Sequence, residues 1–207
     1  ACRRLSCVHP EICENLVTDH GPLIQLMKRV REQPGIKDAH IFCGNVSTRL
    51  CEVHIAPNPP IGVFQTGVAN QQAVMYLDDR GGVWTGQYVA AMEMLKSETG
   101  LLSITLEKDT SLPAAGTTEF RDKPYILRAL TELRQLQPDV RNYVYSSKTG
   151  WAFDNAQKTR IIVGFAERPN VIGEKLNLAE QIRNDRNSKG IVPKIIDVRY
   201  LETPSYR

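Results

Sequence analysis

The sequence RIIVGF at residues 160–165 and the sequence KIIDVRY at residues 194–200 are two short runs rich in β-branched residues. Between them, apolar residues recur at the spacing of one helix face: Ile172, Leu176, Ala179 and Ile182. Gly190 and Pro193 follow where this helix would end. The pattern predicts a strand, an amphipathic helix with Leu176 and Ile182 buried, and a second strand. Because such a unit must cover its apolar faces, we expect the preceding residues to supply a sheet.

The first part of the chain predicts a small α+β unit. A helical stripe over residues 22–33 ends at Gln33-Pro34-Gly35, and residues 36–42 and 49–55 read as strands. The segment Asn58-Pro59-Pro60 is stiff and extended, which is typical of a domain boundary. We therefore predict one unit over residues 1–58 and a second over residues 61–207.

The second part predicts a mixed-sheet β domain with amphipathic helices. Turn-forming residues 78–82 connect two strands of a hairpin. The further expected helices are 88–96 and 123–136, and the further expected strands are 101–106, 140–146 and 151–153. Trp84 and Trp151 are expected to be sheet or core anchors. The predicted fold class of the whole chain is α+β.

Composition excludes some classes of protein. The chain of 207 residues is 42% hydrophobic and 24% charged, and its formal net charge of +3 is too small to indicate nucleic-acid binding. No apolar run approaches the roughly 18 residues of a membrane span, and the N-terminus lacks the apolar segment of a signal peptide. We expect a soluble chain that meets a membrane only through an anchor outside it.

The five cysteines all lie in the first quarter of the chain: Cys2, Cys7, Cys13, Cys43 and Cys51. An odd number gathered at one end is not typical of a disulfide framework. The spacing of the first three does not match a zinc finger. Two interpretations remain: buried thiols in a small local structure, or a metal site formed by Cys2, Cys7, Cys13 and a histidine.

Catalytic motifs are absent from the sequence. There is no phosphate-binding loop, no dinucleotide-binding glycine motif, no Gly-x-Ser-x-Gly elbow and no His-Glu-x-x-His. We therefore expect no enzymatic activity and no cofactor. His54 is expected to face solvent, with a site shared with Cys51 as the alternative. Asp197 lies within a predicted strand, where its carboxylate should pair with Arg199 or another cation.

Several motifs resemble the FtsQ (DivIB) family of bacterial cell-division proteins over about residues 22–207. In the region of its POTRA module these are QPGIKDA at 33–39, LCEVHI at 50–55 and PIGVF at 60–64. In the region of its β domain they are YLDDRGGV at 76–83, GW at 150–151, IVG at 162–164, EKL at 174–176 and IDVRY at 196–200. The resemblance implies a POTRA-like unit followed by an FtsQ-like β domain.

This resemblance also implies a function. Members are non-enzymatic scaffolds that bind other divisome proteins at the extracytoplasmic face of the bacterial cytoplasmic membrane. We expect the strand at 194–200 and its tail to form the partner-binding edge, because no later strand is available to cover it and Pro204 interrupts regular pairing. The candidate contact residues are Ile196, Val198, Tyr200, Leu201 and Tyr206. The alternative is an internal strand with a frayed tail.

The opening of the chain, from Cys2 to about Lys37, resembles a different family: a segment of YgiQ-type radical-SAM proteins. The Cys-x3-Cys-x2-Cys motif that holds their cluster is missing here. The alternative hypothesis for function is accordingly a metal-binding or radical-SAM-like enzyme fragment that uses Cys2, Cys7 and Cys13.

Overall fold

The computed structural model describes residues 3–6, 20–43, 50–65, 73–87, 93, 96, 100–108, 110–117 and 119–207. It confirms the α+β class, since helices accompany two separate sheets. The chain divides into two compact units, Ala1–Pro59 and Pro60–Arg207. Whether each unit folds alone stays a prediction.

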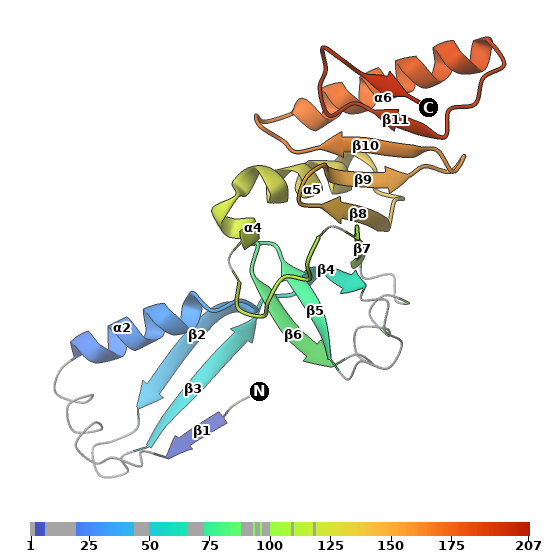
Figure 1. Cartoon of the computed structure of the whole chain (residues 1–207). Coiled ribbons are helices and arrows are strands. Elements are labelled where there is room, and N and C mark those ends of the chain that lie inside the picture. The colour runs from blue at the N-terminus through green and yellow to red at the C-terminus, as the bar shows by residue number, and fades with distance from the viewer. Residues whose placement is uncertain are drawn as a thin grey trace. The chain divides into compact units, whose positions relative to one another are not determined.

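The first unit is a three-stranded antiparallel sheet with a helix against it (Figure 1). Its elements are β1 (Arg3–Ser6), α2 (His20–Arg31), β2 (Ile36–Cys43) and β3 (Leu50–Pro57), and the strand order is β1-β3-β2. Strand alternation places Ala39 and its register partner Ile55 on one face of the sheet and the paired His40 and His54 on the other. Ala39 is fully buried, as expected where α2 packs on β2.

The second unit is built on a nine-stranded mixed sheet in the order β12-β11-β10-β9-β8-β7-β4-β5-β6. The strands are β4 (Pro60–Gln65), β5 (Ala73–Asp78), β6 (Val83–Gln87), β7 (Leu102–Leu106), β8 (Asn142–Ser146), β9 (Gly150–Asp154), β10 (Arg160–Gly164), β11 (Ile195–Asp197) and β12 (Ser205–Tyr206). The helices are α4 (Glu119–Asp122), α5 (Pro124–Leu136) and α6 (Val171–Ser188). The β4–β7, β7–β8 and β10–β11 pairs are parallel, and the other neighbours are antiparallel.

The core of the second unit lies between this sheet and its helices (Figure 1). Consecutive register partners form a buried row across the sheet: Phe64, Ile104, Tyr143, Phe153, Ile161 and Ile196. The buried stripe of α5 is Ile126, Ala129, Leu130 and Leu133. Trp151 anchors α5 to the sheet, because its fully buried indole N–H donates to the carbonyl of Ile126 at 2.8 Å.

The strand-helix-strand unit predicted from the two β-branched runs is present as β10, α6 and β11. The strands β10 and β11 are parallel. The buried side of α6 comprises Val171, Ile172, Lys175 and Ala179, whereas Leu176 and Ile182 are only partly buried. The expected burial of Leu176 and Ile182 is therefore correct only in part. Of the expected helix at 88–96, residues 93 and 96 are helical and the others lie outside the described residues.

The predicted strand at 194–200 is wrong in its length. The strand β11 ends at Asp197, whose carboxylate accepts the backbone N–H of Arg199 at 3.1 Å. This local hydrogen bond competes with the sheet ladder and turns the chain. The tail then returns as β12, which the sequence pattern did not reveal.

Candidate functional site

The C-terminal edge of the large sheet comprises β11, β12 and the connection between them, residues 195–207. The strand β12 pairs with β11, so that Ile196 lies opposite Tyr206 and Asp197 opposite Ser205. Arg207 continues the ladder: its carbonyl accepts from Lys194 N at 2.7 Å and Ile195 N at 3.0 Å, and its N–H donates to Ile195 O at 2.9 Å. The last residue of the chain is therefore fixed to the sheet by its backbone.

This pairing sets the direction of the next backbone groups. In an antiparallel ladder, hydrogen-bonded pairs alternate with pairs whose N–H and C=O groups point away from each other. Because Arg207 and Ile195 are a hydrogen-bonded pair, the N–H and C=O of Tyr206 are directed away from β11. Among the described residues, no backbone hydrogen bond outside the regular strands and helices involves them. Pro204 lacks an N–H, so Tyr206 supplies the outward donor of β12.

The expectation that no later strand covers β11 is wrong, because β12 covers it. Ile196 and Val198 are fully buried, and the N–H of Val198 donates to Ile162 O at 2.9 Å. These two side chains stabilise the core and are not presented to solvent. The alternative predicted an internal strand followed by a frayed tail. It is correct that β11 is internal, but the tail is not frayed, because it pairs with β11 as β12.

The other three predicted contact residues lie nearer the surface. Leu201 packs, partly buried, against the core. Tyr200 and Tyr206 keep 65% and 41% of their residue surface exposed. The guanidinium carbon of Arg186 on α6 lies 4.2 Å from the ring centroid of Tyr206. The exposed aromatic surface at the edge is thus Tyr200 and the uncovered part of Tyr206.

The predicted pairing of Asp197 with Arg199 is confirmed. Arg199 Nη2 lies 2.7 Å from Asp197 Oδ2, and Arg199 Nε lies 3.0 Å from Asp197 Oδ1. Burial acts to raise the pKa of the Asp197 carboxyl, but hydrogen bonds from Arg199 and the charges of Arg199 and Arg207 outweigh it. The pKa of Asp197 therefore lies below its ordinary value, and the carboxylate holds the turn between β11 and β12.

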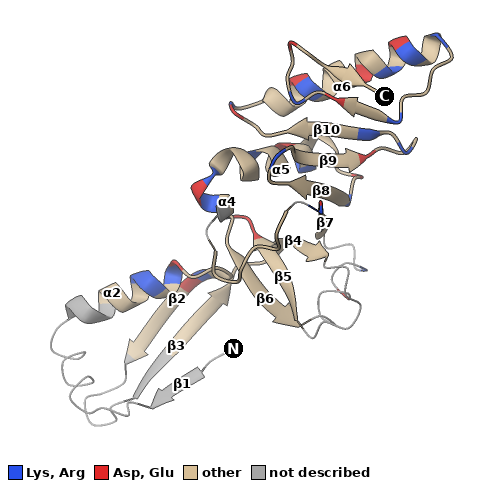
Figure 2. Ribbon diagram, viewed as in Figure 1, with Lys and Arg blue, Asp and Glu red and all other residues tan. Residues whose placement is uncertain are grey.

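Charges on α6 are of mixed sign (Figure 2). Arg183 pairs with Glu180 at 2.6 Å, and Lys189 pairs with Asp185 at 2.7 Å. Such alternating pairs are typical of a solvated helix face.

The opposite edge of the sheet differs from the C-terminal edge. Its strand β6 begins at Val83, whose N–H donates to Thr117 O at 3.3 Å and whose C=O accepts from Gly116 N at 2.8 Å. The loop at 116–117 therefore covers the start of β6.

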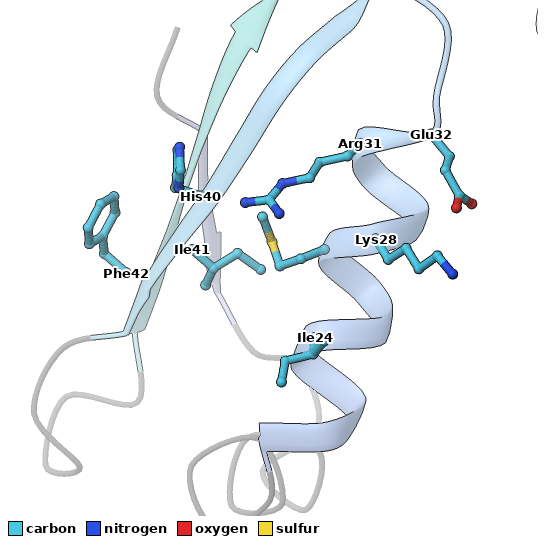
Figure 3. A pocket seen from close by; sticks show the side chains of 8 residues that line it. Ile24, Lys28, Arg31, Glu32, His40, Ile41 and Phe42 are labelled. Carbon is cyan, nitrogen blue, oxygen red and sulfur yellow. The ribbon is translucent and has the colours of Figure 1, made fainter.

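The first unit has an open groove of about 610 Å³ between α2 and β2 (Figure 3). It is lined by Ile24, Met27, Lys28, Arg31, Glu32, His40, Ile41 and Phe42. Arg31 reaches from α2 to β2, where its Nε donates to Ala39 O at 3.2 Å and lies 2.9 Å from Asp38 Oδ1. Asp38 Oδ1 also accepts the N–H of Ala39 at 2.8 Å. Together these side chains bond both backbone groups of Ala39.

The cysteines of the alternative hypothesis, Cys2, Cys7 and Cys13, lie outside the described residues. In the ranges that the structure does describe, no three His, Cys, Asp or Glu side chains are grouped as metal ligands would be. Among the same residues, no helix has both the length and the apolar character needed to cross a membrane.

No family model matches the sequence. A short stretch is similar to proteins named UPF0313. It is 57% identical over 44 residues to the UPF0313 protein of Chromobacterium violaceum and to that of Bradyrhizobium diazoefficiens. It is 56% identical over 43 residues to the UPF0313 protein YgiQ of Salmonella typhimurium. Each match covers 21% of this chain and 6% of the relative.

These matches support the YgiQ-like part of the sequence resemblance. The chain spans only about 6% of the length of the curated relatives it matches, so their activity does not transfer to it. The comparisons give no support to the resemblance to FtsQ, which stays a hypothesis.

Proposed function

We propose that the second unit is a non-enzymatic protein-binding module that receives a partner strand along β12. The observation that carries this proposal is the direction of the Tyr206 backbone, whose N–H and C=O face away from β11. An extended partner segment can pair with such groups, the main chain giving affinity and side-chain contacts giving register. Tyr200 and Tyr206 are the exposed aromatic contacts.

The finer proposal is a cell-division scaffold, in which the partners are extracytoplasmic segments of other divisome proteins. Its support is the order of the FtsQ-like motifs between residues 33 and 200. Under this proposal the unit lies at the outer face of the bacterial cytoplasmic membrane, held by an anchor outside the chain.

The test is a titration of the full chain with purified ectodomains of bacterial division proteins. Tyr206→Pro removes the outward donor and the ring, whereas Tyr206→Ala removes the ring alone. Since one hydrogen bond contributes about 1 kcal/mol, the proline variant should bind about fivefold more weakly than the alanine variant. Circular dichroism and thermal unfolding check that both remain folded.

Different results would contradict strand addition at β12 and the cell-division scaffold proposal. Binding by the wild-type chain that is equal for the proline and alanine variants would contradict strand addition at β12. Failure of the wild-type chain to bind any division-protein ectodomain would contradict the scaffold proposal.

We propose as a second candidate function the alternative hypothesis, to which the UPF0313 matches lend more support than to the scaffold. The matches support a partial similarity to UPF0313 proteins. In this candidate, Cys2, Cys7 and Cys13 bind a metal or cluster. Metal analysis and the visible absorption spectrum of the anaerobically purified chain test it. Iron with charge-transfer absorption, lost in the Cys2→Ser/Cys7→Ser/Cys13→Ser variant, would support it. A colourless chain without metal would contradict it.

A further inference from the structure

Two arginine side chains converge beside Gly100 in the second unit. A Cβ atom placed on Gly100 would lie 3.2 Å from Nη2 of Arg134 and 3.5 Å from Nη1 of Arg141. Arg134 is in the last turn of α5, and Arg141 directly precedes β8. Both residues are exposed. A helix and a strand entry therefore bring two guanidinium groups to one place at the surface.

The backbone holds this arrangement. The strands β7 and β8 are parallel neighbours, and the N–H of Ser103 in β7 donates to the carbonyl of Arg141 at 2.8 Å. The segments that enter the two strands, with Gly100 and Arg141, therefore lie at the same edge of the sheet. Gly100 has a φ of 77° rounded down to 76°, in the left-handed region that favours glycine, and the missing side chain leaves room for the two guanidinium groups.

The hydroxyl of Tyr143 is a third donor in this region. Tyr143 is fully buried, and among the described residues its hydroxyl has no hydrogen-bond partner. Burial raises the pKa of this hydroxyl to about 12, although the nearby charges of Arg141 and Arg134 act to lower it. The hydroxyl is therefore protonated at neutral pH and has a proton to donate. Buried polar groups without a partner are rare in folded proteins, and a bound ion is one of the explanations.

The two guanidinium groups also lack a counter-charge within the part of the chain that the structure describes. None of the ion pairs found there includes Arg134 or Arg141, whereas Arg160, for example, pairs with Asp154 at 2.9 Å. Two like charges brought to one place repel each other. Three donor groups thus gather without an acceptor from the described residues, and an anion would satisfy all three.

We propose that Arg134, Arg141 and the hydroxyl of Tyr143 form a binding site for a phosphate group. A phosphate oxyanion accepts several hydrogen bonds at once, and the planar guanidinium group of arginine can donate two parallel ones to it. Its negative charge also removes the repulsion between the two arginines. The phosphate belongs to a soluble compound or to a phospholipid head group, which present the same oxyanion. The site involves no residue of β12 and does not depend on the proposed function.

The end of α5 alone would account for only one of these arginines. A cation in the last turn of a helix is favoured by the helix dipole. Arg29 has the same position in α2, is exposed, and belongs to no ion pair among the described residues. It therefore provides a matched control for Arg134.

The experiment measures the binding of inorganic phosphate to the full chain by isothermal titration calorimetry, with the ionic strength held constant by sodium chloride. We expect saturable binding to the wild type that is about tenfold weaker in Arg134→Gln and in Arg141→Gln, because each loses hydrogen bonds between charged groups. Arg29→Gln makes the same change in net charge and should alter the affinity by less than about twofold.

Tyr143→Phe gives a result that a purely structural role would not. It removes only the hydroxyl, so without phosphate the Tm should stay equal or rise, since a buried donor without a partner is lost. The affinity for phosphate should nevertheless fall about three- to tenfold, and the increase in Tm on adding phosphate should shrink.

A second measurement distinguishes the two sources of the phosphate group. Sedimentation with phosphatidylglycerol vesicles but not with phosphatidylcholine vesicles, lost in Arg141→Gln, would support the site and assign it to a lipid head group. Binding of inorganic phosphate without such sedimentation would support the site and assign it to a soluble compound. No saturable binding to either probe, an equal loss in Arg29→Gln, or full affinity in Tyr143→Phe and both other variants would each overturn the proposal.

Discussion

The guanidinium carbon of Arg186 lies 4.2 Å above the centroid of the Tyr206 ring, and this contact joins α6 to the last strand of the sheet. Tyr206 follows Ile196 in the buried row of register partners, so its ring is on the helix side of the sheet. Arg186 therefore covers Tyr206, the residue that extends this row at the edge of the sheet. A partner that uses the Tyr206 ring as an anchor has to share it with Arg186.

Replacing Arg186 by alanine should loosen β12. A cation–π contact at a partly exposed site contributes about 0.5–1 kcal/mol. The backbone bonds between Ile195 and Arg207 hold β12 in place, so their amide hydrogens should exchange about two- to fivefold faster in Arg186→Ala. Native-state hydrogen exchange measures this. Arg183→Ala, on the same helix but paired with Glu180, is the control, and equal exchange in both variants would contradict the role of Arg186.

The pH dependence of stability should include Asp197. Because the folded pKa of its carboxyl is below the ordinary value, the ionised form stabilises the fold. This contribution is complete above the unfolded-state pKa of about 3.9 and is lost as the pH falls through the folded pKa. Urea denaturation should therefore show Asp197→Asn to be less stable than the wild type at neutral pH, with the difference shrinking below about pH 4.

The exposed residue Asp139 provides the control for this titration. Asp139→Asn makes the same change in net charge away from the β11–β12 turn. A difference between Asp197→Asn and the wild type that stays constant from neutral to acid pH would show that the carboxylate acts through its shape alone.

The sequence predicted those elements whose pattern is local. β-Branched runs gave β10 and part of β11, helical spacing gave α5 and α6, and the turn at 78–82 gave the β5–β6 hairpin. It did not reveal β12, since Ser205 and Tyr206 are too short a run to show alternation. Their pairing depends on β11, a tertiary contact. Similarly, β4 was hidden because Pro60 and Gly62 resemble a linker.

The sequence placed the edge of the sheet near the C-terminus but not its details, and binding of a partner there stays a prediction. The sequence indicated the strand at 194–200 as the edge of the sheet. The edge is instead β12, formed by the tail after that strand. Asp197 and Arg199 were the available signal: a carboxylate two residues before an arginine can accept the backbone N–H that would otherwise continue the ladder. The alternation of hydrogen-bonded pairs that directs Tyr206 outward needs the register, which no single-sequence pattern gives.

Two apolar side chains on α6 should differ in their contribution to stability. Ile172 is fully buried, whereas Leu176 is only partly buried against the same core. We expect Ile172→Ala to lower the free energy of unfolding by about 2–5 kcal/mol, and Leu176→Ala by about half as much. Chemical denaturation at neutral pH measures both. A larger loss for Leu176→Ala would show that the buried face of α6 is assigned incorrectly.

The second unit should fold without the first. Its sheet and helices form their own core, and the boundary falls between Pro59 and Pro60. Residues 60–207 expressed alone should show cooperative thermal unfolding and dispersed amide signals. The boundary itself is short, because Asn58 is buried and its N–H donates to Gly35 O at 2.8 Å. Aggregation or non-cooperative unfolding of 60–207 would contradict independent folding.

Lys175 is a buried charged residue on α6 whose burial the helical spacing of apolar residues did not predict. Its side chain is 2% exposed, and its Nζ donates to Phe165 O at 2.7 Å and to Glu167 Oε2 at 3.3 Å. These bonds hold the segment between β10 and α6, while the aliphatic stem packs with the apolar face of the helix. Lys175→Met keeps an unbranched side chain but loses both donors, and Lys175→Ala loses the packing as well.

We therefore expect Lys175→Met to lower the free energy of unfolding by about 1–3 kcal/mol, because the Phe165 carbonyl loses its charged donor. Lys175→Ala should cost more, by the cavity that it leaves. Lys189→Met, at an exposed lysine paired with Asp185, should change stability by less than about 1 kcal/mol. Urea denaturation of the three variants at neutral pH distinguishes the contributions. If Lys175→Met were as stable as the wild type, burial of the charge would cost as much as its two hydrogen bonds contribute.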